Sequence, residues 1–582
     1  MKEDEILVGN PLIYCAFALF LGSFDYTIFY ENEFIGVAFA ASFFIIVFLT
    51  LNKELYYMII IFFIMGYFIN MIYFTTNLPD KKAKIVVNIM EDRGFIKRAT
   101  YKGKELNILK SKENFKKGDI VYLEGEFKRN IDFSRGNIGE IETNYAKKIA
   151  EGKLSKVNLL KENLYKKFSE VLGEENTGVL MALSFGEDQY ISKEHKEELK
   201  DLGVIHAISV SGFHMAIVFK VLDFIPFLSI KSFIAFIYVL FTGGKPSTIR
   251  AFIMIFILKV SPKIFKSYNV LSALSFSSLI LLSIKPYYVV NPGFVLSYLA
   301  VLGIIIFNNK ISRKLYKLPK FIRESLSLTI SSQSLSSFYS IAIFNQYSMG
   351  GFLGNLFLLP FYSFIVILGN IALIFNKVPF IFKPICYIIL SIMELYNVIE
   401  NLLLCIVPKS IYLNYFHILC LVFIIFSYML IKKGFEYAKF SIIPITIFYF
   451  LSVFNVFPQI NFYNIGTREC AIIKYKWHSI ALCKSPEDLK KIKEPIDKSF
   501  ILDGGQTEEI ILGDYVIIGK TNKSFKNNII LEFEDEKEFF VISTLPKKNL
   551  NISYRNVKVI EAKGKKLYNN YGKSFARLYL IE

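Results

Sequence analysis

Apolar runs of membrane-crossing length constrain this chain more than any other feature of its sequence. Three of them, near residues 11–30, 34–51 and 55–75, open the chain, and residues 203–458 are again mostly apolar. An α-helix needs about 20 apolar residues to cross the roughly 30 Å of hydrocarbon in a bilayer. Because hydrophobic residues make up 53% of the 582 residues, the sequence predicts a polytopic α-helical membrane protein and argues against a soluble globular one.

The first apolar run predicts a retained span rather than a cleaved signal peptide. The segment before it, MKEDEILVGN, is mixed in charge, and no small-residue cleavage site precedes the second run. Lys53, in the link between the second and third runs, favours a cytoplasmic N-terminus by the positive-inside rule. We therefore expect N-terminal transmembrane helices over residues 1–78, with residue 80 on the outer side of the membrane.

Residues 79–150 predict a small external β domain. Short runs rich in Val, Ile and Tyr are separated by Gly and Asn, as in GDIVYLEGEFKRN, and such spacing is typical of about five strands. The length fits an OB-like β-barrel. Residues 80–148 carry 17 basic and 11 acidic side chains, which suits an anionic partner, either lipid head groups or nucleic acid. The alternative is a lysine-rich composition with positive loops inside the cell.

Residues 151–200 predict an amphipathic or interfacial helical segment. Apolar side chains recur at helical spacing between residues 153 and 172, and lysines such as Lys161 populate the remaining positions. This helix either lies in the plane of the lipid head groups or packs on its own domain. The apolar positions are Val157, Leu160, Leu164, Phe168 and Val171.

Residues 201–458 predict a second transmembrane domain. Several of its apolar segments are too short to cross a bilayer unaided. Such segments are tolerated at membrane depth only where protein covers them or where they line a wet cavity, so they are a first indication of a pathway. The segments lie near residues 203–224, 229–243, 246–260, 268–285, 293–308, 326–345, 350–375, 384–407, 412–431 and 440–458.

The stretch HAISVSGFHMAIV, residues 206–218, brings a polar cluster into the first of these segments: His206, Ser209, Ser211, Gly212 and His214. On a continuous helix the two histidines share one face. Gly212 weakens the helix, and a break would expose backbone groups that Ser209 and Ser211 are placed to satisfy. The cluster either lines a pathway or packs against other helices. A catalytic pair of Ser211 and His214 would lack a third, orienting group.

The stretch FTGGKPSTIRAFIM, residues 241–254, places Arg250 one turn into an apolar helix that Pro246 is expected to begin. The guanidinium either reaches the lipid interface or meets a phosphate.

Three further stretches hold polar residues in apolar surroundings. NPGFVLSYLAVLG has a helix-start signal at Asn291 and contains Ser297, and NLFLLP contains Asn355. SSQSLSSFYS, residues 331–340, would be costly against lipid, so we expect it to face protein or water.

In the order in which they occur, these stretches resemble the ComEC family of competence proteins, the membrane channels of natural transformation. HAISVSGFHMAI is similar to the family's H-hydrophobic-x-x-S-G-x-H stretch and TGGKPSTIRAFIM to its T-G-x-x-x-S-x-x-R-A segment. NPGFVLSYLAVLG resembles its P-x-x-x-x-x-G-F-x-L-S-x-x-A segment, and GNLFLLPFYS its N-L-hydrophobic-x-x-P segment. Upstream, ALSFGEDQYIS resembles the stretch before the channel, and GDIVYLEGEF part of the external OB-like domain.

The resemblance implies a competence channel-like transmembrane domain over residues 201–458 that passes single-stranded DNA across the cytoplasmic membrane. Expected partners are single-stranded DNA, membrane lipids, a DNA receptor protein and, since no Walker A motif is visible, a separate cytoplasmic helicase or ATPase. The alternatives are a transporter of another anionic or lipid-linked substrate and a membrane-bound hydrolase. The pathway residues would be His206, Ser209, Ser211, Gly212, His214, Arg250, Ser297 and Asn355.

The OB-like domain is expected to receive the strand with basic side chains and base-stacking aromatic rings. The alternative for the aromatic residues is packing in the barrel core. The residues expected to bind DNA are Tyr101, Tyr122, Lys128 and Arg129.

Residues 459–582 alternate strand-like runs with Lys-rich turns and predict a soluble mixed α/β or mainly β domain. INFYNIGTRECAIIKY and SFILDGG resemble the start of the metallo-β-lactamase-like domain that many members of the family carry. The family's H-x-H-x-D-H ligand set is absent, and His478 is the only histidine after His417. Zinc or manganese catalysis needs several ligands in one shell. We therefore expect a degenerate domain, no metal or other cofactor, and no enzymatic activity.

Overall fold

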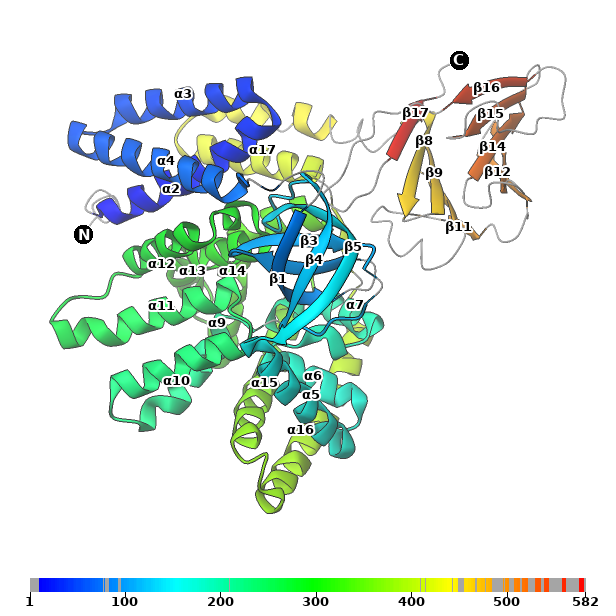
Figure 1. The fold of residues 1–582 in the computed structure, drawn as a ribbon. Coiled ribbons are helices and arrows are strands. Elements are labelled where there is room, and N and C mark those ends of the chain that lie inside the picture. The colour runs from blue at the N-terminus through cyan, green and yellow to red at the C-terminus, as the bar shows by residue number, and fades with distance from the viewer. Residues whose placement is uncertain are drawn as a thin grey trace. The chain divides into compact units, whose positions relative to one another are not determined.

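The computed structural model describes residues 10–76, 78, 83–92, 96–111, 113–208, 210–408, 410–413, 415–441 and 443–447, together with residue 496 and the strands of the C-terminal part. The chain divides into two units. The first comprises Met1–Ser340 and Ser348–Ser410, and the second comprises Ile341–Tyr347 and Ile411–Glu582. Figure 1 labels their helices and strands.

Three apolar helices open the first unit and coincide with the three predicted spans: α2 (Pro11–Glu31), α3 (Glu33–Thr50) and α4 (Lys53–Phe74). Helices α2 and α4 lie against each other (Figure 1), and glycines set their separation. A Cβ on Gly66 would overlap the carbonyl oxygen of Leu19, and a Cβ on Gly22 would overlap that of Phe63. Small residues allow this close approach of transmembrane helices.

A closed five-stranded barrel follows, in the order β1-β2-β3-β5-β4. All neighbours pair antiparallel except β3 and β5, which are parallel. Alternate residues of β1, such as Ile85, Val87 and Ile89, point into the barrel core. The predicted OB-like barrel after the third span is confirmed. Its strands are β1 (Ala83–Asp92), β2 (Ile96–Tyr101), β3 (Lys104–Leu109), β4 (Asp119–Lys128) and β5 (Asn137–Glu151).

The rest of the first unit is helical. Six helices of the described residues, α2, α3, α4, α13, α15 and α16, are long and apolar enough to span a membrane, so the chain is a multi-pass membrane protein. Between residues 153 and 260 lie α5 (Lys153–Leu172), α6 (Glu174–Phe185), η1 (Asp188–Tyr190), α7 (Lys193–Asp201), α8 (Ile205–Ile208), α9 (Gly212–Val221), η2 (Leu222–Phe224), α10 (Leu228–Phe241) and α11 (Pro246–Val260). After them come η3 (Ser261–Ile264), α12 (Val270–Ile284), η4 (Pro286–Val290), α13 (Pro292–Lys314), α14 (Lys320–Phe344), α15 (Gly351–Ile374) and α16 (Pro379–Ile406).

Helix α5 packs on its own domain. Its residues Leu164, Phe168 and Leu172 are buried in one apolar cluster with residues of α6, α15 and α16. The prediction that Lys161 belongs to the polar face of this helix is wrong, because its side chain is 4% exposed. Lys161 lies three residues before Leu164, on the same helical face, and Glu187 compensates its charge at 2.7 Å.

The predicted segment 203–224 is not one helix. It is divided into α8, of one turn, and α9, so His206 and His214 do not share a continuous helical face. The predicted helix starts elsewhere are confirmed. Pro246 begins α11, and the side chain of Asn291 accepts a hydrogen bond from the backbone of Phe294 at 3.2 Å where α13 begins.

The second unit contains a short β6–β7 pair, helix α17 and two five-stranded sheets. The sheets are ordered β11-β10-β9-β8-β17 and β12-β13-β14-β15-β16, each with one parallel pair. The tail was predicted to be mixed α/β or mainly β, and its described elements are strands. The helices expected of a mixed α/β tail would fall outside the described residues. The elements are β6 (Gln346–Tyr347), β7 (Ile411–Tyr412), α17 (Tyr415–Lys432), η5 (Glu436–Ser441), β8 (Asn455–Ile465), β9 (Arg468–Lys476), β10 (His478–Cys483), β11 (Lys498–Ile501), β12 (Thr507–Leu512), β13 (Tyr515–Thr521), β14 (Ile529–Glu534), β15 (Phe539–Ser543), β16 (Val557–Glu561) and β17 (Phe575–Tyr579).

Candidate functional site

The break between α8 and α9 is held by the first turn of α11. The carbonyl of Val210 lies outside both helices and accepts hydrogen bonds from the hydroxyls of Thr248, at 3.1 Å, and Ser247, at 3.3 Å. Ser211 satisfies backbone at the break as expected, because it forms a capping box with His214 at the start of α9, but it is not the partner of the Val210 carbonyl. Hydroxyls from a helix 37 and 38 positions away reach it instead, because the N-terminus of α11 lies directly against the break.

His214 stands over the start of α9. Its Nδ1 accepts a 3.1 Å hydrogen bond from the backbone N–H of Ser211, whose hydroxyl lies 3.3 Å from the same nitrogen. An imidazole nitrogen that accepts from an N–H carries no proton, so the proton of His214 is assigned to Nε2. That nitrogen is buried and has no hydrogen-bond partner among the described residues.

Arg250 lies against the same helix start. A Cβ on Gly212, the first residue of α9, would be 3.1 Å from Nη2 of the guanidinium. Nη1 donates to the backbone carbonyl of Ser297 at 3.0 Å, and the guanidinium lies 5.9 Å from the centre of the Tyr298 ring. The side chain is only 7% exposed, so the alternative in which Arg250 reaches out to the lipid interface is wrong.

Three helix N-termini meet around these two side chains. The start of α9 contacts that of α11 through Val210, and a Cβ on Gly293, in the first turn of α13, would lie 3.9 Å from Pro246 Cγ. The first N–H groups of a helix have no partner within the helix, and the helix dipole makes this end positive. The arrangement therefore concentrates positive potential in one place.

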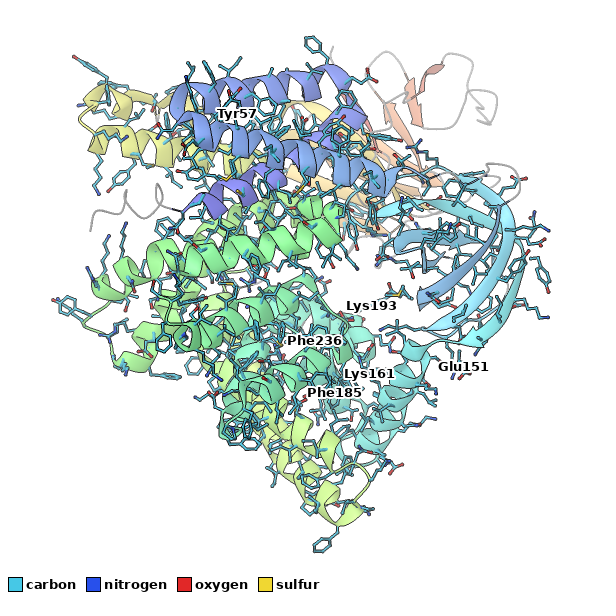
Figure 2. All side chains as sticks on the ribbon, turned by 60° about the vertical axis from the view of Figure 1, so that its left-hand side comes forward. Tyr57, Glu151, Lys161, Phe185, Lys193 and Phe236 are labelled. Atoms are coloured by element: carbon cyan, nitrogen blue, oxygen red, sulfur yellow. The ribbon has the colours of Figure 1, made fainter. Side chains whose placement is uncertain are left out.

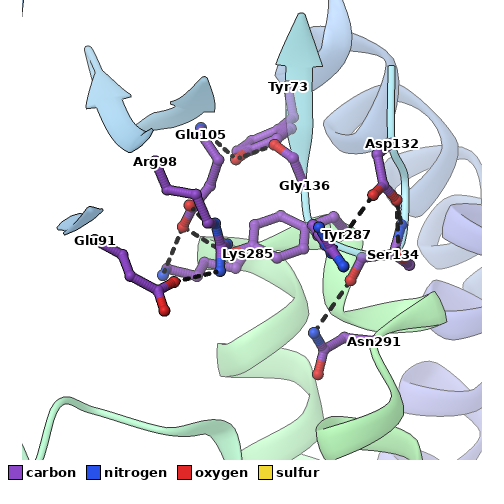
Figure 3. Close-up of polar contacts among 11 residues, drawn as sticks. Tyr73, Glu91, Arg98, Glu105, Asp132, Ser134, Gly136, Lys285, Tyr287 and Asn291 are labelled. Atoms are coloured by element: carbon purple, nitrogen blue, oxygen red, sulfur yellow. Dashed lines mark hydrogen bonds and ion pairs between the residues drawn. The ribbon is translucent and has the colours of Figure 1, made fainter. Parts of the chain in front are cut away.

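The barrel contacts η4 and the start of α13, as Figure 3 shows. The side-chain amide of Asn291 donates to the carbonyl of Ser134 in the β4–β5 loop at 3.2 Å. Tyr287 donates to Glu105 of β3 at 3.3 Å, and Glu105 also pairs with Arg98 at 3.1 Å. These contacts place the barrel next to the first turn of α13.

A second, charged contact joins the barrel to the helices. Nζ of Lys161 lies 2.7 Å from Oε1 of Glu187 and donates to the carbonyl of Phe185 at 3.0 Å; Lys117, before β4, lies 3.4 Å from the same carboxylate. Figure 2 labels Lys161 and Phe185. Burial by itself raises the pKa of Glu187, but the charges of Lys161 and Lys117 outweigh it and leave the pKa below its ordinary value. Burial lowers the pKa of Lys161 more than Glu187 raises it.

The structure brings together five of the predicted pathway residues. Ser211, Gly212, His214 and Arg250 form the cluster just described, and Ser297 joins it through its backbone carbonyl rather than its hydroxyl. The sequence did not indicate that Ser297 would contribute its backbone carbonyl rather than its side chain.

The other predicted pathway residues are placed differently. The side chain of His206 is exposed, and Ser209 lies outside the described residues. Asn355 is buried on α15, where its amide nitrogen donates to the hydroxyl of Thr329 of α14 at 3.2 Å, while its Oδ1 has no partner among the described residues.

The serines of residues 331–340 are largely satisfied within their own helix. The hydroxyl of Ser332 donates to the carbonyl of Thr329 at 3.0 Å, and that of Ser336 to the carbonyl of Ser332 at 2.7 Å. A Cβ on Gly303 of α13 would overlap the carbonyl oxygen of Ser331. Gly303 therefore permits close approach of α13 and α14 at Ser331, so part of the segment faces protein, as expected.

The predicted DNA-binding residues of the barrel divide by exposure. Lys128 and Arg129 are exposed; Lys128 pairs with Glu142 at 2.8 Å, and Arg129 lies 6.0 Å from the ring centre of Tyr30. Tyr101 and Tyr122 are half-buried, and the hydroxyl of Tyr122 donates to Glu124 at 2.6 Å. The two tyrosines keep part of their rings accessible.

Three functional contacts were missed by sequence reasoning. They are the ion pairs of Glu187, the hydroxyls of Ser247 and Thr248, and the bond between Asn291 and Ser134. Glu187 lies in the stretch ALSFGEDQYIS, which the family resemblance included without a role. A lysine on the apolar face of α5 was the available signal for its partner.

Comparison with known proteins finds a family match over part of the chain. A family model described as "Competence protein" matches residues 183–435, which include the break, α11 and the start of α13. These residues therefore carry the similarity of the chain to competence proteins. The expected ComEC resemblance is thereby confirmed, whereas the degenerate metallo-β-lactamase-like tail stays a prediction.

Two relatives show how far the similarity of this chain extends. It is 25% identical over 226 residues to ComE operon protein 3 of Bacillus subtilis (strain 168), which covers 37% of this chain and 29% of that protein. It is 29% identical over 154 residues to an uncharacterized protein of Aquifex aeolicus (strain VF5), which covers 25% of this chain and 37% of that protein. The chain thus matches well under half the length of either relative. No solved structure matches it.

Proposed function

We propose that this chain is a competence protein that takes up DNA by passing a single strand from its barrel into the helical domain and across the cytoplasmic membrane. The observation that carries the proposal is the seating of the barrel on the start of α13, where Asn291 bonds to Ser134, with the buried guanidinium of Arg250 held by the same helix. An OB-like barrel is a common receiver of single strands, and a polyanion entering the bilayer requires a polar, positive path.

The proposal includes no chemical step. Within the described residues no group of three His, Cys, Asp or Glu side chains is placed to hold a metal. We propose that the chain is a conduit and not a nuclease, and that a DNA receptor protein and a cytoplasmic helicase or ATPase act with it. These partners and the direction of transport come from the family resemblance.

Uptake of labelled DNA tests the proposal. Cells that lack the gene are given fluorescent duplex DNA, and the strand protected from external nuclease is measured after complementation with the wild type, Arg250→Ala, His206→Ala or Lys259→Ala. Lys259 lies at the opposite end of α11 and pairs with Asp223 at 2.9 Å, so it is the matched control. Uptake should require the gene, be lost in Arg250→Ala and His206→Ala, and persist in Lys259→Ala, with all variants inserted to equal levels.

Two results would contradict the proposal. One is protected DNA in the deletion strain at wild-type levels. The other combines two observations. Purified protein in liposomes conducts a small anion, with the flux abolished by Arg250→Ala, and DNA uptake by cells does not depend on the gene. The second result would support the transporter alternative.

A further inference from the structure

Two buried N–H groups at the start of α9 have no partner within the described residues. They are Nε of Arg250 and Nε2 of His214, whose side chains are 7% and 0% exposed. Buried donors in folded proteins are almost always bonded, and one left unpaired destabilises the folded state. Two such donors beside one helix start indicate that the site is completed by a ligand with several acceptor atoms.

The surroundings select an anion. The guanidinium of Arg250 lies 5.9 Å from the centre of the Tyr298 ring and donates to the backbone carbonyl of Ser297 at 3.0 Å. No carboxylate pairs with Arg250 among the described residues. The N-termini of α9, α11 and α13 add positive potential at the same place.

The ligand chemistry follows from the donor set. A guanidinium and helix N-terminal amides together favour a tetrahedral oxyanion over chloride, because several donors can each meet a separate oxygen. Gly212 lets the guanidinium lie close to the helix end, since a Cβ there would be only 3.1 Å from Nη2 of Arg250.

We infer that Arg250, His214 and the first turn of α9 form a binding site for one phosphodiester group of the transported strand. The assignment of the phosphate to the transported strand rests on the proposed function. The existence of the site rests on the unpaired donors alone. Within the transport sequence, the site is where backbone phosphates are desolvated one at a time after leaving the barrel.

The test uses the purified full-length protein in detergent and its thermal unfolding. The unfolding temperature is measured in sodium phosphate and in sodium chloride at equal ionic strength, and with an abasic deoxyribose-phosphate oligomer. It is also measured in nanodiscs that contain or lack phosphatidylglycerol. These arms distinguish a free phosphate, a strand backbone and a lipid head group. The variants are Arg250→Gln, Arg250→Lys, His214→Gln, Gly212→Ala and the control Lys259→Gln.

Phosphate and the abasic oligomer should raise the unfolding temperature of the wild type and of Lys259→Gln. The concentration needed should rise about tenfold or more in Arg250→Gln, as expected for loss of a charged hydrogen bond. Gly212→Ala should weaken phosphate binding although it changes no charge. Weaker binding in this variant therefore reports a change in the site's geometry and not a loss of net positive charge. Arg250→Lys should recover only part of the effect, because an ammonium lacks the planar donor set.

Three results would overturn the inference: no stabilisation by either phosphate ligand, equal stabilisation in folded Arg250→Gln, or stabilisation by phosphatidylglycerol alone. Failure of the inference remains distinct from failure of the proposed function. Gene-dependent DNA uptake with no phosphate effect would refute only the site. Phosphate binding that requires Arg250, in a protein whose deletion leaves uptake intact, would refute only the conduit.

Discussion

The hydroxyl of Thr248 donates a 3.1 Å hydrogen bond to the carbonyl of Val210, and this bond joins two stretches that lie 38 positions apart. Ser247 donates to the same oxygen at 3.3 Å. A carbonyl released by a helix break must find a donor when water is absent. The first turn of α11 therefore acts as the support of the interrupted α8–α9 segment.

Removal of both hydroxyls should cost more than the sum of the single removals. Thr248→Val or Ser247→Ala alone leaves one donor and should lower the free energy of unfolding by about 1 kcal/mol or less. The double variant leaves the Val210 carbonyl unpaired and should cost about 1–3 kcal/mol. Thermal unfolding of the purified protein measures all three. If the two single losses in the free energy of unfolding simply add up to that of the double variant, the two hydroxyls do not share one role.

Replacement of Gly66 by alanine should destabilise the pair of helices α2 and α4. In an isolated helix this change is favourable by about 1 kcal/mol. In the folded protein the new Cβ overlaps the Leu19 carbonyl, and overpacking costs about 1–3 kcal/mol. The sign of the change in unfolding temperature decides between these effects, and an increase would mean that α2 and α4 do not approach at Gly66.

Glu187→Gln should destabilise the junction of the barrel with α5. The change leaves Lys161 charged and 4% exposed without its counter-ion, and breaking a buried pair costs about 3 kcal/mol or more. The matched control is Glu162→Gln, whose pair with Lys116 at 3.6 Å is exposed and should change stability little.

The ion pair of Glu187 and Lys161 should also make the stability of the protein depend on pH. Because the pKa of Glu187 lies below its ordinary value in the folded chain, its contribution is present above about pH 4.3 and is lost as pH falls through the folded pKa. Glu187→Gln should flatten the fall in unfolding temperature over this acidic range. An unchanged acid profile would show that Glu187 is not the responsible group.

The buried pair of His195 and Glu400, 3.1 Å apart, should give a second pH dependence of opposite sign. Burial alone lowers the pKa of His195, but the hydrogen bond and charge of Glu400, with Glu198 and Glu175, leave it above its ordinary value. The stabilisation is therefore complete below about pH 6.5 and is lost as pH rises through the folded pKa. Unfolding temperature measured against pH should fall over that window in the wild type, and Glu400→Gln should remove this fall.

Much of the fold was predictable because its signals are local. The spans α2, α3 and α4 follow from apolar length, the barrel from alternating short strands, and the starts of α11 and α13 from Pro246 and Asn291. Each of these depends on residues within a few positions of one another. The candidate site was predictable only in part: the polar stretches were recognised, but not which of their atoms meet.

Sequence alone determined that this chain is a multi-pass membrane protein with an OB-like barrel and polar residues at the starts of particular helices, because hydrophobic length, alternation and capping act over short distances. Only the tertiary structure decided that α8 and α9 are separate, that Lys161 is buried, and that Arg250 lies against Gly212. Those outcomes depend on contacts between side chains and backbone groups tens of positions apart, whose pairing is chosen by how helices pack and not by any period in the sequence.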